Sequence, residues 1–172
     1  MNVKSALTGQ YHAALAMLKE CIERCPENLW IADSHPVPFW RVAYHTLYGT
    51  HLYLQPDEAH FQPWELHRDG CQELPGPHET MSDVTPYTKS EILRYWRFCN
   101  DMVSVAVEEL DLDAPESGFS WHKMPKLDHQ LQNIRHIQHH TALLSGRLRQ
   151  ACGTYIIWVR RNNETYLSAR QE

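Results

Sequence analysis

The stretch Asn133–Leu148, which reads NIRHIQHHTALLSGRL, does most to decide how the chain is expected to fold. An α-helix turns by about 100° per residue, so side chains three and four positions apart share a face. One such face collects a mostly apolar stripe of six residues, namely Asn133, Ile137, His140, Leu144, Leu148 and Ala151. The stretch therefore predicts an amphipathic helix that starts near Pro125 and ends at Gly153, a natural left-handed cap.

Three other segments show the same helical spacing. The first is predicted to be helical over roughly 5–25, because apolar residues recur at intervals of three and four until Pro26. The second follows the prolines of HPVP and covers roughly 38–54. The third begins with a capping box, Thr88-Lys89-Ser90-Glu91, and its apolar stripe continues to Leu110.

The connection between the second and third of these helices, Gln55–Tyr87, contains five prolines and little periodicity. It is longer than an ordinary loop, which favours either a crossover in a bundle or a loop over a site. We therefore expect an all-α fold, a four-helix bundle with a long crossover connection, formed by residues 1–172 as a single domain. The apolar run Tyr155–Val159 is too short to assign.

The composition narrows the class of protein. Apolar residues make up 42% of the chain and charged residues 22%, as in ordinary soluble domains. A formal net charge of −5 without blocks of like charge argues against nucleic-acid partners, and no apolar run approaches a membrane span. The amino terminus has no long apolar core and the five cysteines fit reduced thiols packed in helices, so we expect a cytoplasmic protein.

The 12 histidines are far more than a core needs, and three of them lie within five residues, at His136, His139 and His140. Positions 136 and 140 differ by about 40° around the helix axis, so their imidazoles can reach one metal ion. His139 lies about 100° from His140, on the side away from the apolar stripe, and is expected to face solvent. The alternative is one packed histidine beside two solvated ones.

A third ligand has to come from another helix. His45 shares a face with apolar neighbours and with Gly49, which leaves room beside it, whereas His51 is about 120° off that line and is expected to be peripheral. A buried neutral imidazole needs partners for both ring nitrogens, and helix-interior backbone groups are already engaged. Burial of His45 therefore favours a ligand role.

The segments PFWRVAYHTLYGTHLYL (38–54) and NIRHIQHHTALLSGRLR (133–149) resemble the two signature helices of the DinB/YfiT-like superfamily of metal-binding four-helix bundles. The resemblance extends over most of the chain, including the capped third helix and the pair Trp158-Val159. It implies that His45, His136 and His140 bind a divalent metal ion, with Zn²⁺ or Ni²⁺ suited to three imidazoles. Leu143 stands where many members carry glutamine, so no role of that residue carries over.

The resemblance also implies an activity, because characterised relatives include transferases that use low-molecular-weight thiols. A thiol S-transferase acting on a small-molecule substrate is therefore the leading hypothesis. A metal-dependent hydrolase and a non-catalytic metal-binding or stress-response module are the alternatives, and a homodimer is expected on the same resemblance. No motif marks a catalytic acid or base. Glu65, His67 and Glu79 on the long connection are candidates, but the sequence favours a solvated surface position over a functional role for each of them.

Overall fold

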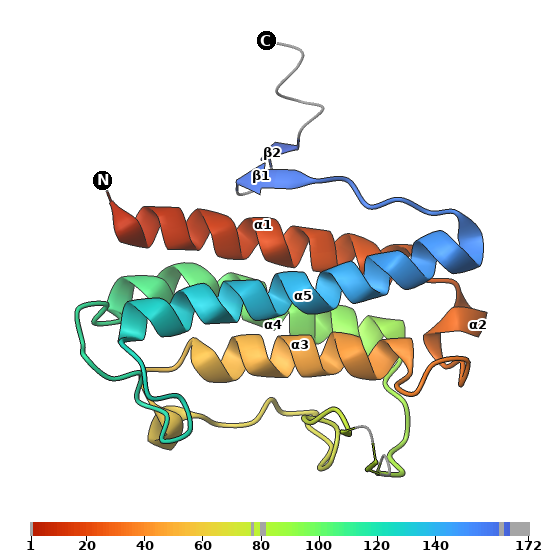
Figure 1. Ribbon diagram of the computed structural model, residues 1–172, viewed down its shortest axis with the longest axis horizontal. Helices are drawn as coiled ribbons and strands as arrows, with labels where there is room; N and C mark the ends of the chain where they lie inside the picture. Colours follow the sequence, from red (N-terminus) through yellow and green to blue (C-terminus); the bar gives the residue numbers. More distant parts are fainter. Residues whose placement is uncertain (1, 77, 80–81, 162–163, 166–172) are drawn as a thin grey trace.

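The computed structural model describes residues 2–76, 78–79, 82–161 and 164–165, and most of them are helical (Figure 1). The elements are α1 (Val3–Arg24), α2 (Glu27–Trp30), α3 (Phe39–Tyr53), the 3-10 helix η1 (Glu58–His60), α4 (Lys89–Glu109), α5 (Lys126–Cys152), β1 (Val159–Arg161) and β2 (Glu164–Thr165). The all-α prediction is confirmed. The one-turn helix α2 and the short antiparallel pair β1–β2 were not expected.

The four long helices lie side by side (Figure 1). Helix α1 packs against α4 and α5, and α3 packs against the same two helices. The colours of Figure 1 show that α1 and α5 run in one direction and that α3 and α4 run in the other. The connection between α3 and α4 consequently returns along the length of α3, past η1, before α4 begins.

The interior is built from the apolar stripes predicted from the sequence. On α5, Ile137, Leu144 and Leu148 are fully buried, and they pack with stripes of α1, α3 and α4 into one hydrophobic core. Ala151, the last member of the predicted stripe, is exposed because the helix ends one residue later. The burial pattern fixes the rotation of α5 about its axis, and with it the direction of each histidine.

Two predicted helix ends are confirmed in atomic detail. The Thr88 side chain accepts from the backbone N–H of Glu91 at 3.2 Å, and the Glu91 carboxylate accepts from the backbone N–H of Thr88 at 2.7 Å. These bonds satisfy two backbone donors that the first turn of α4 would leave unpaired. Gly153 ends α5 with a φ of 67°, a left-handed conformation that glycine adopts without strain.

The five cysteines are free thiols, and four of them are buried in the helical core. Burial raises the pKa of Cys21 and that of Cys25 to about 12. Thiols with such pKa values stay protonated at neutral pH, so they act as small apolar side chains rather than as nucleophiles.

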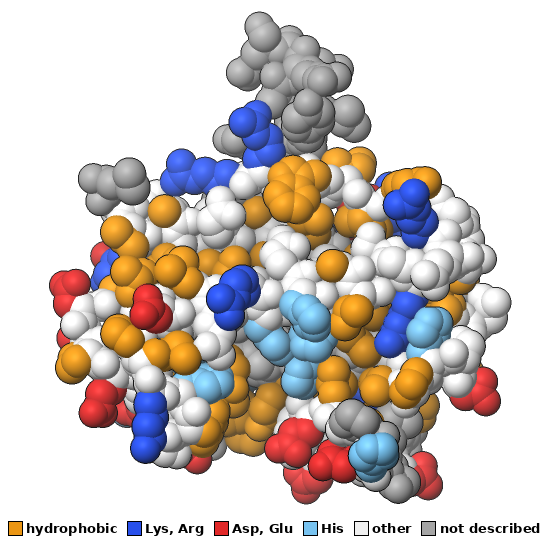
Figure 2. Space-filling view, viewed as in Figure 1, with side chains coloured by type: hydrophobic (Ala, Val, Ile, Leu, Met, Phe, Trp, Pro, Cys, Tyr) orange, Lys and Arg blue, Asp and Glu red, His pale blue; other side chains and the backbone are white. Residues whose placement is uncertain are grey.

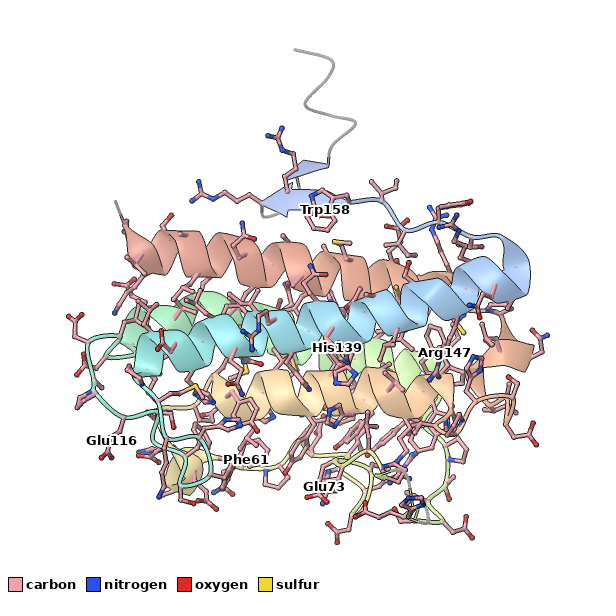
Figure 3. The ribbon with its side chains drawn as sticks, in the orientation of Figure 1. Phe61, Glu73, Glu116, His139, Arg147 and Trp158 are labelled. Carbon is pink, nitrogen blue, oxygen red and sulfur yellow. The ribbon has the colours of Figure 1, made fainter. Side chains whose placement is uncertain are left out.

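The segment after α5 folds back along α1 (Figure 1). Val159 of β1 packs against Ala13 and Met17 of α1, while Trp158 next to it is exposed (Figure 3). The described helices include none with the length and apolar character that a membrane span requires.

Candidate metal centre

His45 of α3 and the pair His136 and His140 of α5 come together where these two helices pack. One nitrogen from each ring lies within 4.8 Å of the others. The ring centroids of His45 are 4.9 Å from His136 and 4.7 Å from His140. The structure therefore brings together the same three histidines that the sequence singled out.

The two histidines of α5 stand one turn apart on the same face, with ring centroids 4.6 Å from each other. His140 is buried and His136 is half-buried. His139 (labelled in Figure 3) is exposed, and its ring centroid is 5.0 Å from that of His140. The helical face argument thus separates the adjacent residues His139 and His140 correctly.

A backbone carbonyl of the long connection orients the ring of His45. Its Nδ1 donates to the carbonyl oxygen of Gln72 at 2.7 Å, so the proton of the neutral imidazole is on Nδ1 and the lone pair is on Nε2. A histidine that binds a metal typically donates its other N–H in this way. This lone pair of His45 faces His136, whose Nε2 lies 3.0 Å from the Nε2 of His45, at hydrogen-bond distance.

The three rings fit a divalent metal ion by their geometry and their unpaired atoms. Two nitrogen ligands at about 2.0–2.1 Å from one tetrahedral zinc ion are about 3.3 Å apart, close to the 3.0 Å between His45 and His136. The buried Nδ1 atoms of His136 and His140 have no hydrogen-bond partner within the described part of the chain. Neutral imidazoles are good ligands for Zn²⁺ and Ni²⁺.

Burial keeps these imidazoles uncharged. Loss of solvation lowers the pKa of His45, that of His136 to about 4 and that of His140 to about 3. Repulsion between the neighbouring rings adds to the effect at His136 and His140. At neutral pH all three side chains therefore carry lone pairs and no positive charge that would oppose a cation.

Gly49 makes room for the imidazole of His136, whereas the sequence suggested that it makes room for His45. A Cβ atom on Gly49 would lie 2.7 Å from Cε1 of His136 and 3.2 Å from its Nδ1. We expected the glycine to leave space beside His45 on its own helix. Instead, the imidazole of His136 on α5 packs against the backbone of α3 at Gly49. This close approach allows the rings of His45 and His136 to come into contact.

Arg41 fixes the segment that carries Gln72. This buried side chain donates to the carbonyl oxygens of Gly70 and of Ser82, and to the Ser82 hydroxyl at 2.8 Å. Arg41 is one helical turn before His45, so two residues on one face of α3 bind the same part of the connection. The connection thereby acts as a support for the histidine cluster.

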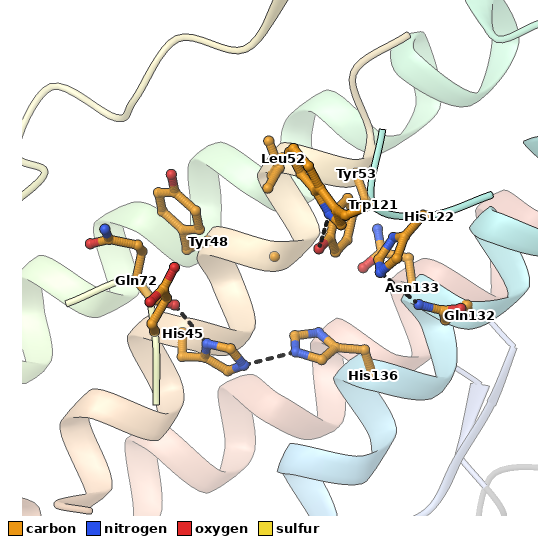
Figure 4. A pocket seen from close by; sticks show the side chains of 12 residues that line it. His45, Tyr48, Leu52, Tyr53, Gln72, Trp121, His122, Gln132, Asn133 and His136 are labelled. Carbon is orange, nitrogen blue, oxygen red and sulfur yellow. Dashed lines mark hydrogen bonds between the residues drawn. The ribbon is translucent and has the colours of Figure 1, made fainter. Parts of the chain in front are cut away.

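A pocket of about 610 Å³ opens beside His45 and His136 (Figure 4). Its walls come from α3, from the long connection, from the segment before α5 and from α5 itself, and the residues are His45, Tyr48, Gly49, Leu52, Tyr53, Gln72, Glu73, Trp121, His122, Gln132, Asn133 and His136. Aromatic side chains and a few amides and imidazoles make up most of this lining. Such a lining suits a small organic molecule held next to the histidines.

The same face is visible from outside the molecule. Figure 2 shows histidine side chains gathered near its middle, among apolar groups, with acidic side chains along the edge formed by the connection. Glu73 lies on that edge (Figure 3), and it is the only carboxylate among the described residues that line the pocket. The histidine cluster is therefore reachable from solvent through a partly polar opening.

His51 is not peripheral, contrary to our expectation. It is 4% exposed, its Nδ1 lies 3.1 Å from the hydroxyl of Tyr95, and its ring packs against Phe61 and Phe98. The helical angle placed it off the His45 line correctly, but the connection and α4 cover that second face of α3. It is a core histidine outside the cluster.

The three candidates on the connection lie outside the pocket lining. Glu65 pairs with Arg94, and Glu79 accepts from the backbone N–H of Gly76 at 2.8 Å. Nδ1 of His67 lies 2.6 Å from the hydroxyl of Tyr44. Each is accounted for by a local structural contact.

Besides residues on α3 and α5, four pocket residues that the sequence did not reveal come from irregular segments. Gln72 and Glu73 are on the long connection, while Trp121 and His122 precede α5. These segments have no periodicity from which the direction of a side chain can be predicted. The unusual length of the connection was the one available signal, and it left a structural and a functional reading open.

Comparison of the chain with family models, curated proteins and solved structures gives no match. The geometry described above is therefore the basis for the function proposed below.

Proposed function

We propose that the chain is a metal-binding protein of the DinB/YfiT-like type, a four-helix bundle with a crossover connection between α3 and α4. The packing of α1, α3, α4 and α5, together with the connection that returns along α3, supports this assignment. So does the cluster of His45, His136 and His140 at the interface of α3 and α5. The resemblance of the two histidine-bearing helices to the signature segments of that superfamily is independent support.

Within this type, we propose a metal-dependent enzyme that transfers a low-molecular-weight thiol to a small electrophilic substrate. The single observation that carries the proposal is the 610 Å³ pocket whose wall includes two of the three clustered histidines. A module that only stores or senses a metal needs no such space, whereas an enzyme needs its substrate beside the ion. The ion, Zn²⁺ or Ni²⁺, would supply acidity by lowering the pKa of a bound thiol.

The chain's own residues have distinct parts in this proposal. His45, His136 and His140 hold the ion, and the Gln72 carbonyl keeps the His45 ring in the ligating tautomer. The aromatic walls, which include Tyr53, exclude water from an apolar substrate. The amide side chains on the wall offer donors and acceptors that orient its polar groups.

The test is a titration of the cobalt-substituted protein with small thiols, followed by its visible spectrum. Binding of a thiolate to the ion predicts a sulfur-to-metal charge-transfer band that saturates with thiol concentration. Methanol at the same concentrations is the matched control and should give no such band. A wild-type protein that binds cobalt but gives no band with any thiol would contradict the transferase proposal and favour a hydrolase.

A further inference from the structure

A second pair of histidines lies across the pocket from the candidate metal centre. His122 belongs to the segment before α5 and lines the pocket, and His129 is in the second turn of α5. Nδ1 of His122 is 3.0 Å from Nε2 of His129, which is a hydrogen bond between two imidazoles (Figure 4 shows His122). His129 is completely buried, and His122 is half-buried, so only one member of the pair can meet a bound molecule.

The hydrogen bonds around the pair define where its protons are. The side-chain N–H of Gln132 donates to Nε2 of His122 at 3.3 Å, which leaves the His122 proton on Nδ1. That proton is donated to Nε2 of His129, and the His129 proton is then on its own Nδ1. This last nitrogen is buried and has no partner among the described residues. The Nε2 lone pair of His122 thus accepts from the amide of Gln132, and both of these side chains line the pocket.

The surroundings keep both rings neutral, and no carboxylate of the described residues pairs with either of them. Tyr53 of α3 packs against both imidazoles, and Lys126 and His136 are the neighbouring basic groups of α5. The ammonium of Lys126 is occupied by carbonyl oxygens of Pro56 and Ser117. Burial lowers the pKa of His122, and burial together with repulsion from His122 and Lys126 lowers the pKa of His129 to about 4. Near pH 7 the pair is therefore an uncharged base.

We propose that His122 is the proton acceptor of this pocket and that His129 is the residue that positions it. The inference rests on the proposed thiol chemistry and adds to it the group that takes the thiol proton. The thiol replaces the amide of Gln132 at Nε2 of His122, whose lone pair then forms the new N–H bond, while the electron pair of the broken S–H bond stays on sulfur. The positive charge of the resulting imidazolium is stabilised through Nδ1–H by the acceptor Nε2 of His129. The proton later leaves to solvent or to the departing group of the substrate.

The proposal is tested by how fast a thiol is captured at different pH values. The probe is 2-mercaptoethanol, mixed by stopped flow with the cobalt-substituted protein while the charge-transfer band is recorded. A simple thiol has a pKa of about 8.5, so about 1% of it is thiolate at pH 6.5. The wild-type rate should stay nearly level from pH 8 down to pH 6.5, because neutral His122 removes the proton. In His122→Gln the rate should follow free thiolate and fall about tenfold per pH unit.

Substitutions of His129 separate positioning from mere structural support. His129→Leu removes the acceptor, so the imidazolium of His122 is less stable and the acid limb of the rate profile should move to lower pH, with a lower plateau. His129→Gln offers an amide oxygen near the position of Nε2 and should restore most of the wild-type profile. His139→Gln, an exposed histidine of the same helix, is the matched control and should leave the profile unchanged.

Two results would overturn the inference, and they are distinguishable. If the band forms in His122→Gln with the wild-type pH dependence, His122 is not the proton acceptor, although the transferase proposal stands. If the wild-type protein gives no band at any pH, the proposed function fails and this inference fails with it. Cobalt content and the far-ultraviolet dichroism of each variant show that the comparison is made between folded, loaded proteins.

Discussion

His139 and His140 are neighbours in the sequence, yet only the second lies against His45. The difference arises from helix geometry alone, because successive side chains of α5 point about 100° apart. Replacing His45, His136 or His140 by Ala should lower metal affinity by about 100-fold or more, since two imidazoles hold an ion far less tightly than three. Competition with a chromophoric chelator measures the affinity of each variant.

Two further histidines serve as controls in that series. His139→Ala should keep the wild-type affinity and change the free energy of unfolding by no more than about 0.5 kcal/mol, because its side chain is exposed. His51→Ala should also keep the affinity but lose about 2–4 kcal/mol of stability, since it empties a buried site. Loss of metal by His139→Ala with retention by His136→Ala would show that the assigned face of α5 is wrong.

Gly49 provides a test that leaves every ligand in place. A methyl group at this position would lie 2.7 Å from the His136 ring, closer than a carbon contact allows. Gly49→Ala should therefore displace the His136 ring and lower metal affinity by about tenfold, although alanine is the better helix former. Gly146→Ala on the exposed side of α5 meets no neighbouring atom and should leave the affinity unchanged. Equal affinities in both variants would mean that the ring does not need this contact.

At the scale of elements, the sequence predicted the helices and helix ends that apolar periodicity and local spacing define. The four long helices, the Thr88 capping box and the Gly153 cap follow from spacing and from local backbone chemistry. The three clustered histidines could be chosen because each has a definite direction on a predicted helix. Gln72 and His122 could not be chosen from the sequence, because they lie on irregular segments. The positions of such segments are fixed by tertiary contacts such as those of Arg41.

The hydrogen bonds of Arg41 join α3 to the long connection, and they lead to a prediction at the scale of elements. Arg41→Met should lower the free energy of unfolding by about 2–4 kcal/mol, because several carbonyl oxygens lose a charged donor in a buried place. The backbone amides of Gln72 and Glu73 should exchange with solvent hydrogen faster, and metal affinity should fall with the loosened His45 contact. Arg97→Met, at an exposed position of α4, is the control. Unchanged exchange at these two amides would contradict a supporting role for Arg41.

For the whole molecule, the buried histidines predict acid sensitivity of the metal-free protein. Burial lowers the pKa of His51, that of His129 and that of His136 to about 4, whereas an unfolded chain protonates histidine near its ordinary value of about 6.5. The unfolded state therefore binds more protons between pH 6.5 and 4, and stability should fall as the pH drops through this window. Urea unfolding at several pH values measures the effect. A constant midpoint between pH 7 and 5 would contradict neutral burial.

The central claim is that the packing of α3 against α5 creates one divalent-metal site per chain. Its most direct test is elemental analysis of protein without a histidine tag, produced with Zn²⁺ and Ni²⁺ in the medium and dialysed at pH 7.5. The account predicts about one ion per chain in the wild type, lost in His136→Ala and on acidification, because imidazole must be neutral to bind. Metal no higher than background in the wild type, or equal metal in wild type and His136→Ala, would contradict it.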